Sequence, residues 1–303
     1  MNIPPEFINP TKIVDTSYVV YYVMFSTWNW FKNEFDVSPD PLYDPMTEKE
    51  FCTCFKNKFK SNIERTARSL YKMSTLNNTI FALDAPKNCI WRNEFNETYK
   101  LERKQRDKSD QEFSYSGAFN YVKNILIPNI MDEHKNVKLI EHSMAEGDDV
   151  IAICAKELPE TTHKLIIATD RDLGQLLSIP NTRIISLQQK ELTCLGETEK
   201  VKKLVEANYT MTPKDLLLQK ILVGDKADGI QSIVPRMGPG TAAKYILDKN
   251  ELKKFLDDPE NIDAKTRFKQ NQKLIDFKFI PEEIVANIKQ QLFATTDPIL
   301  QEL

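Results

Sequence analysis

Short apolar runs, each ending where a polar residue begins, recur along the first two thirds of the chain. We interpret five of them as β-strands, at 12–15, 79–84, 137–141, 164–170 and 183–187. Longer stretches between them have apolar positions at helical spacing and predict helices at roughly 48–75, 114–132 and 147–158. Strands alternating with helices indicate an α/β fold with a mostly parallel central sheet that helices cover on both faces.

After about residue 195 the strand pattern fades and helical patterns follow. They predict helices near 199–207, 213–223, 240–248, 250–257 and 281–292, and Pro213 and Pro281 stand where first-turn prolines are common. We therefore expect an α/β core at 1–192 and a helical region at 193–303. The densely charged stretch 87–108 has no clear core stripe, so we expect a protruding arch near 87–113.

Composition narrows the class of protein. The chain has 303 residues, of which 41% are hydrophobic and 28% charged, as in ordinary globular proteins. No apolar run is long enough for a membrane span, and the first residues lack a signal-peptide layout. Five Cys without paired spacing indicate a reducing compartment, so we expect a cytoplasmic protein that does not bind membranes. Three His, all outside the motifs below, disfavour zinc and His-base chemistry.

Acidic residues stand where the predicted strands end. They are Asp15, Asp84, Glu146, Asp148, Asp149, Asp170 and Asp172. Ligands of open α/β sheets bind at the carboxyl edge of the strands, so these acids should converge there. They would repel one another unless cations lay between them, and oxygen ligands favour Mg²⁺ or Mn²⁺. Any one Asp after a strand is more often a helix N-cap, so the prediction depends on the whole set.

Two turns in the helical region extend the pattern. Asp225 and Asp228 follow Gly224, which we expect to end a helix, although the segment alone could be a simple Asx turn. About a dozen residues later, Gly238-Pro-Gly240 opens a helix, and the N–H groups of a starting helix favour an anion. This pattern is typical of a helix–hairpin–helix turn that binds a nucleic-acid phosphate, although a plain turn is the commoner alternative.

The net charge of the whole chain does not show that the chain is basic outside the expected metal pocket. The chain has 41 Lys and Arg against 44 Asp and Glu, but nine of the acids belong to the expected metal pocket, and the rest of the chain is basic. In the stretch 87–108, Trp91, Phe95 and Tyr99 are interleaved with Lys and Arg. That mixture suits a single-stranded backbone with unstacked bases, and a solvated helix face is the alternative.

The order of these acid motifs, followed by the glycine turn, resembles the flap-endonuclease family of 5′-nucleases. Segments 91–95 and 99–103 also resemble the arch of that family, and 271–288 resembles a C-terminal segment, so the resemblance spans roughly 11–292. It implies a PIN-like 5′-nuclease core with two Mg²⁺ ions, for which Mn²⁺ can substitute. It also implies hydrolysis of phosphodiesters at 5′ ends of RNA–DNA hybrids and of nicked or flapped DNA, as in primer removal during phage replication.

The resemblance also implies roles for individual residues. Asp84 and Asp148 would bind the first ion directly, with Asp15 and Glu146 acting through water. Asp170 and Asp172 would bind the second ion, supported by Asp149, Asp225 and Asp228. The arch residues Lys100, Arg103 and Arg92 would contact the scissile phosphate. The other expected nucleic-acid contacts are Tyr99, Lys104, Gly238, Gly240, Thr241 and Lys244, and a monovalent cation could share the 238–240 turn.

We expect a monomer, and the resemblance suggests a sliding clamp or a single-strand-binding protein as partners. Two other functions remain open. A PIN-type endoribonuclease shares the strand-end acids but lacks the arch and the glycine turn. A non-catalytic module that binds junctions or single-stranded DNA would keep the arch and the turn but not nine acids. Mg²⁺-dependent release of short products from a 5′-labelled hybrid would separate all three.

Overall fold

The structure is a computed structural model that describes residues 9–72, 75–101 and 111–294. Its centre is one parallel sheet with the strand order β3-β2-β1-β4-β5. The strands are β1 (Thr11–Asp15), β2 (Thr79–Ala82), β3 (Val137–Ile140), β4 (Lys164–Ile167) and β5 (Thr182–Ile185). All five predicted strands are therefore confirmed. The strand order reverses between β1 and β4, and ligands of such sheets bind at the carboxyl ends of the strands beside that point.

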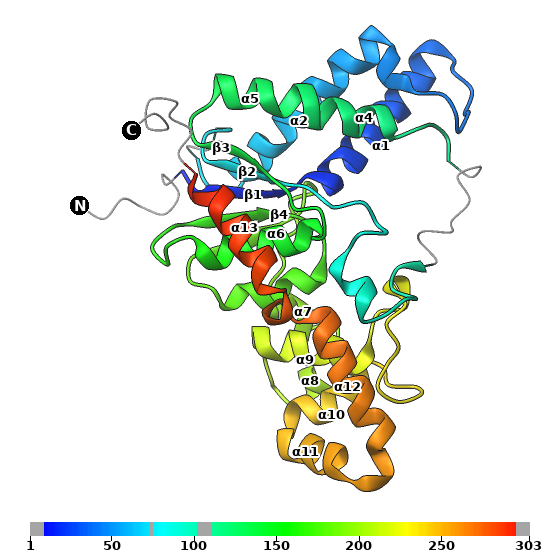
Figure 1. Cartoon of the computed structure of the whole chain (residues 1–303), viewed down its shortest axis with the longest axis vertical. Helices are drawn as coiled ribbons and strands as arrows, with labels where there is room; N and C mark the ends of the chain where they lie inside the picture. The colour runs from blue at the N-terminus through cyan, green and yellow to red at the C-terminus, as the bar shows by residue number, and fades with distance from the viewer. Residues whose placement is uncertain (1–8, 73–74, 102–110, 295–303) are drawn as a thin grey trace.

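Helices cover both faces of the sheet (Figure 1). One face is covered by α1 (Thr16–Phe35), α2 (Lys49–Arg68), and a helical run of α4 (Ser116–Tyr121), a π-helical segment (Val122–Leu126) and α5 (Ile127–Glu133). The other face is covered by α6 (Gly147–Glu157) and α13 (Glu282–Phe293).

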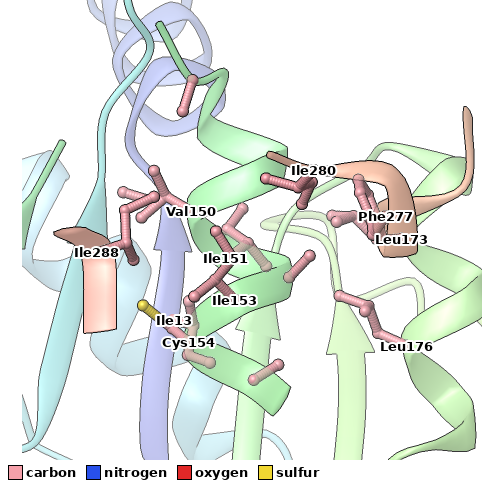
Figure 2. Packing of buried hydrophobic residues seen from close by; sticks show 14 of the residues in the cluster. Ile13, Val150, Ile151, Ile153, Cys154, Leu173, Leu176, Phe277, Ile280 and Ile288 are labelled. Carbon is pink, nitrogen blue, oxygen red and sulfur yellow. The ribbon is translucent and has the colours of Figure 1, made fainter. Parts of the chain in front are cut away.

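Side chains alternate between the two faces along each strand. Ile13 of β1 packs with Val150 and Ile151 of α6 and with Ile288 of α13 (Figure 2). Its neighbour Val14 belongs to the cluster on the opposite face, with the α1 and α2 side chains. Because both faces are buried, the strands read as continuous apolar runs, and this explains why they could be predicted.

Helix α1 was not predicted, although it has 20 residues. Its buried side chains recur at helical spacing from Thr16 to Phe31. The exposed face, however, also carries large apolar side chains, namely Tyr21, Phe25 and Trp30. Apolar residues on both faces hide the stripe that identifies an amphipathic helix. No helix in the described part of the chain is long and apolar enough to cross a membrane.

The second part of the chain is helical, as predicted. It contains α7 (Cys194–Thr198), α8 (Lys202–Glu206), α9 (Pro213–Val223), α10 (Pro239–Leu247), α11 (Lys249–Asp257) and α12 (Ile262–Ile275). The predicted helix at 199–207 corresponds to α8, and the prediction missed α7 and α12. Two small apolar clusters hold these helices together. The last helix, α13, returns to α6 and the sheet and packs there through Ile284 and Ile288.

Short 3-10 helices fill several connections. They lie at Pro45–Thr47, Trp91–Glu94, Arg171–Ser178, Lys226–Asp228, Pro259–Asn261 and Phe277–Phe279. The segment Arg171–Ser178 follows β4, and Lys226–Asp228 follows α9, so both begin beside acidic residues that the sequence singled out.

Candidate metal centre and nucleic-acid interface

Three of the predicted metal ligands are also caps of helical segments. Asp15 ends β1, and its Oδ1 accepts the Tyr18 N–H at 2.9 Å. Asp170 Oδ1 accepts the Asp172 N–H at 2.8 Å. Asp225 Oδ1 accepts the Ala227 N–H at 2.8 Å. The capping alternative is therefore correct for these residues, and the caps hold their carboxylates in fixed orientations.

Asp84 is held against the start of α6. Its Oδ1 accepts the Gly147 N–H at 2.7 Å, and its Oδ2 accepts the Ser17 hydroxyl. A Cβ at position 147 would lie 3.2 Å from Asp84 Oδ1, which explains the glycine. The backbone of α6 thus brings Asp84 beside Asp148, which is the next residue of that helix.

The carboxylates at the sheet edge repel one another. Burial and the nearby carboxylates of Asp84 and Asp170 raise the pKa of Asp15 to about 7. Burial, Asp170 and Asp15 also raise the pKa of Asp148. Burial and Asp170 raise the pKa of Asp172 to about 6. Acids from β1, β2, β4 and α6 are therefore brought together as the sequence predicted.

This donor set fits a hard divalent cation. The cluster offers carboxylate oxygens only, and a cation would relieve the repulsion that raises these pKa values. Among the described residues, no group of three acidic, His or Cys side chains is arranged in this conformation to hold an ion.

Two lysines contact different acids of the cluster. Lys100 Nζ pairs with Glu146 Oε1 and lies 3.8 Å from Asp228 Oδ2. Lys220 Nζ lies 2.8 Å from Asp172 Oδ1 and 2.7 Å from Asp225 Oδ2. Their charges stabilise the partner acids. Burial opposes ionisation of Glu146 and Asp225, but the neighbouring lysines lower the pKa of each.

Sequence reasoning missed Lys220. The available signal was its position four residues before Gly224, at the end of the predicted helix 213–223. The Gly224 N–H donates to the Lys220 carbonyl at 2.8 Å, so the last turn of α9 carries this lysine beside the acidic turn. A lysine in the last turn of a helix is common for other reasons, which makes the signal weak.

Arg92 and Asp149 correct two expectations. Arg92 is only 3% exposed, and its Nη1 and Nη2 donate to Asp149 Oδ2 and Oδ1, both at 2.7 Å. Nη1 also donates to Glu146 at 3.0 Å, and Nε donates to the Leu274 carbonyl at 2.7 Å. The Arg92 guanidinium is thus buried and bonded to Glu146 and Asp149, and the Asp149 carboxylate faces Arg92.

The segment expected to form a protruding arch has a base that docks on the protein. Tyr99 is buried and donates to Glu146 at 2.8 Å, so it does not present the expected nucleic-acid contact. The backbone at Lys100 is left-handed (φ 53°), and its N–H donates to the Asp228 carbonyl at 2.9 Å. A continuous helix through Lys100 is therefore wrong. Arg103 and Lys104 lie outside the described residues.

One glycine fixes this docking. Gly229 has φ 74°, and a Cβ there would lie 2.7 Å from the Thr98 carbonyl oxygen. The base of the arch segment therefore rests directly on the backbone of the acidic turn that ends at Gly229. Movement of one should move the other.

The glycine turn leads into α10 as predicted. Gly238 precedes the helix, Pro239 is its first residue, and a Cβ at Gly238 or Gly240 would meet no atom within 4 Å. The side chains of Thr241 and Lys244 are exposed, and Lys244 pairs with Glu251. A cavity of about 1250 Å³ is lined by Asp172, Lys220 and Asp225 at one part and by Gly238 and Pro239 at another, so it joins these two acids to this turn.

Comparisons with known proteins agree with this geometry. A family model described as the N-terminal, resolvase-like domain of 5′-3′ exonucleases matches residues 49–206, just over half of the chain. Ribonuclease H of Enterobacteria phage T4 is 27% identical over 250 residues, covering 77% of this chain and 73% of that protein. A 5′-3′ exonuclease of Halalkalibacterium halodurans is 30% identical over 154 residues, covering 50% of this chain and 47% of that protein.

Solved structures share the fold. The phage T5 5′-exonuclease with bound zinc ions has a TM-score of 0.61 and 18% identity, covering 93% of this chain and 97% of that chain. The phage T5 flap endonuclease in a complex with DNA and metal ions has a TM-score of 0.61 and 16% identity, with the same coverage. With the match over 49–206, these findings confirm the resemblance to flap endonucleases, and the chain belongs to the 5′-3′ exonuclease family of nucleases.

Proposed function

We propose that this nuclease hydrolyses phosphodiesters at the 5′ ends of RNA–DNA hybrids and of nicked or flapped DNA, with two divalent ions, Mg²⁺ or Mn²⁺. The observation that carries the proposal is the meeting of acids from separate strand ends with the acidic turn after α9. A large cavity leads from Asp172 and Asp225 of that cluster to the 238–240 turn. The names of the phage T4 and T5 relatives support the substrate classes.

We divide the acids into two groups as the family resemblance implies. Asp84 and Asp148, which meet at the start of α6, would hold the first ion with Asp15 and Glu146. Asp170 and Asp172 would hold the second with Asp225 and Asp228, and Asp170 lies close to Asp148 and Asp15 as well. Held by these residues, two such ions would supply activation of a water molecule and stabilisation of the leaving oxygen. Asp149 has a different part in this proposal, because it holds Arg92.

The chain supplies its own positive charge to the reacting phosphate. Lys100 lies at the edge of the cluster, 15% exposed at its side chain, and a modest movement would turn its ammonium towards a bound phosphodiester. There it would neutralise charge that develops on the phosphoryl oxygens. Arg92 and Tyr99 both donate to Oε2 of Glu146, whereas Lys100 contacts Oε1. They would therefore keep Glu146 in place when Lys100 moves away from it. Arg103 and Lys104 remain proposed contacts of the arch.

The 238–240 turn would bind the backbone of the duplex. The N–H groups at the start of α10 point away from the helix, and Thr241 and Lys244 are exposed beside them. Such contacts grip phosphate without reading sequence. A monovalent cation at the turn would add to the attraction. We place the activity in primer removal during phage replication, by a monomer that works with a clamp or a single-strand-binding protein.

A 5′-labelled RNA–DNA hybrid tests the proposal. We expect short labelled products when Mg²⁺ is present and none after exhaustive chelation, with activity restored by Mg²⁺ or Mn²⁺. Full activity in the chelator would contradict the metal requirement. Cuts confined to internal positions of single-stranded RNA would favour a PIN-type endoribonuclease. Binding without product would favour a non-catalytic module.

A further inference from the structure

Lys220 bridges two acids that come from different parts of the fold. Its ammonium lies 2.8 Å from Asp172 Oδ1, after β4, and 2.7 Å from Asp225 Oδ2, in the turn after α9. The side chains of Lys220, Asp172 and Asp225 are 25%, 18% and 23% exposed. The contacts are therefore largely shielded from water. A charge pair that is shielded in this way is stronger than one at the surface.

Asp172 and Asp225, whose carboxylates Lys220 contacts, are also among the residues that would hold the second divalent ion. An ammonium and a divalent cation that share these carboxylates would stand within a few ångströms of each other and repel strongly. The two cations therefore exclude each other at Asp172 and Asp225. Lys100 has different partners, because it pairs with Glu146 and lies 3.8 Å from Asp228.

We propose that Lys220 is a tethered counter-ion that competes with the second divalent cation for Asp172 and Asp225. This inference rests on the two-ion site of the proposed function. It keeps the second site weak in the free protein, because an entering ion must displace the ammonium. A nucleic-acid phosphate offers that ammonium a new partner, and Lys220 lines the cavity through which the phosphate would enter.

The consequence is a coupling between substrate and the second ion. A phosphate that attracts the ammonium of Lys220 frees the acids for the ion, and by linkage the ion strengthens binding of the phosphate. The free protein would then hold one divalent ion tightly and would bind the second only when nucleic acid is also bound. Such coupling would limit hydrolysis away from the correct substrate.

Mn²⁺ binding to the full chain without nucleic acid tests the competition. Calorimetric or electron-paramagnetic titration would compare the wild type with Lys220→Met, Lys220→Arg and Lys226→Met. Lys226 is a matched control, because it lies in the same turn, is exposed, and makes no ion pair with any residue that the structure describes. Lys220→Gln repeats the test with a polar side chain should the Met variant fold poorly.

We expect Lys220→Met to tighten the weaker Mn²⁺ site at least tenfold, or about 1.4 kcal/mol. The Mn²⁺ affinity of the stronger site should change little in Lys220→Met. Lys220→Arg should leave the weaker site as weak as in the wild type, and Lys226→Met should change the affinity of that site less than threefold. An unchanged or weaker second site in both Lys220→Met and Lys220→Gln would overturn the inference, and two-ion binding by the wild type would still support the proposed function. No Mn²⁺ binding by any of these proteins would contradict both.

The coupling has its own readout. In an Asp148→Asn background, chosen to prevent cleavage, a bound RNA–DNA hybrid should tighten the second Mn²⁺ site about tenfold when Lys220 is present. The same hybrid should tighten it much less in the Lys220→Met protein, whose second site is already free. Equal tightening in the two proteins would overturn the coupling.

Discussion

Asp15, Asp170 and Asp225 each use one carboxylate oxygen to accept an N–H at the start of a helical segment. That bond sets the direction of the side chain, so the cap also places a candidate ligand at the sheet edge. The strand-end acids could be predicted because their positions follow directly from the apolar runs. The ion pairs of Arg92 and Lys220 could not, because their partners lie far away in the sequence or on another element.

The Arg92 guanidinium stabilises two buried acids. Arg92→Met would leave Glu146 and Asp149 without this charge, and we expect it to lower the free energy of unfolding by about 3–5 kcal/mol. Urea denaturation measures the change. Arg183→Met is the control, because Arg183 pairs with Glu191 at the surface and should cost about 1 kcal/mol or less. Equal losses of unfolding free energy in the two variants would show that the buried ion pairs of Arg92 stabilise the fold no more than a surface pair does.

Lys12 gives the stability of the protein a pH dependence. It lies in β1, where burial lowers its pKa to about 7, and its Nζ contacts the Asn9 side chain and the Pro10 carbonyl. The unfolded chain, with an ordinary lysine pKa, binds more protons between about pH 7 and pH 10. The contribution of Lys12 to stability therefore rises with pH across that window, by at most about 1.4 kcal/mol per unit.

Lys12→Met should remove this contribution. We expect the variant to gain stability over the wild type at pH 7 and to lose that advantage progressively towards pH 10, as measured by urea denaturation at several pH values. The exposed Lys253→Met should show a difference that stays flat with pH. A flat difference for Lys12→Met as well would mean that Lys12 stays charged throughout.

At the scale of elements, the base of the arch segment and the turn at 225–229 act as one unit. The Lys100 N–H donates to the Asp228 carbonyl, and Gly229 packs on the Thr98 carbonyl. Helices with one apolar stripe, such as α2, could be predicted, whereas α1 with its two apolar faces could not. The docking of the base of the arch could not be predicted either. Its many charged residues indicate an exposed segment, although Trp91 and Tyr99 within it are buried.

Lys100→Ala tests the role of the arch base. We expect the single-turnover rate to fall by roughly 10²-fold, about 2.7 kcal/mol, with a much smaller loss of binding, because the ammonium acts on charge that develops in the transition state. Lys226→Ala removes the same charge from the turn that the arch contacts, and should leave the rate within a few-fold of the wild type. Equal losses of binding alone in both variants would reduce Lys100 to part of a basic surface.

Gly240→Asp tests the turn before α10. A Cβ at this position meets no protein atom within 4 Å, so Asp can be accommodated there and should place a carboxylate near the bound phosphate. We expect duplex binding to weaken about fivefold at moderate salt, or about 1 kcal/mol. Gly240→Asn, with the same shape and no charge, should bind nearly as the wild type. Unchanged affinity in Gly240→Asp would show that the turn does not contact phosphate.

In the whole molecule, the site lies where the α/β core meets the helical region. The core supplies acids from β1, β2, β4 and α6, while α9 and its following turn supply Asp225, Asp228 and Lys220. The fold class and the acid set could be predicted from sequence, because parallel strands bring their ends to one edge. The packing of the α/β core against the helical region decides which acid faces which lysine. It could not be predicted, because it depends on contacts between residues far apart in the sequence.

The central claim is that the acids at the sheet edge carry out catalysis as ligands of divalent ions and are not needed to bind the substrate. Single-turnover cleavage and equilibrium binding of one 5′-labelled RNA–DNA hybrid, measured for Asp148→Asn beside the exposed control Asp132→Asn, test it most directly. We expect Asp148→Asn to lose about 10³-fold or more in rate, with a dissociation constant within threefold of the wild type, and Asp132→Asn to lose neither. A near wild-type rate in Asp148→Asn would contradict the account.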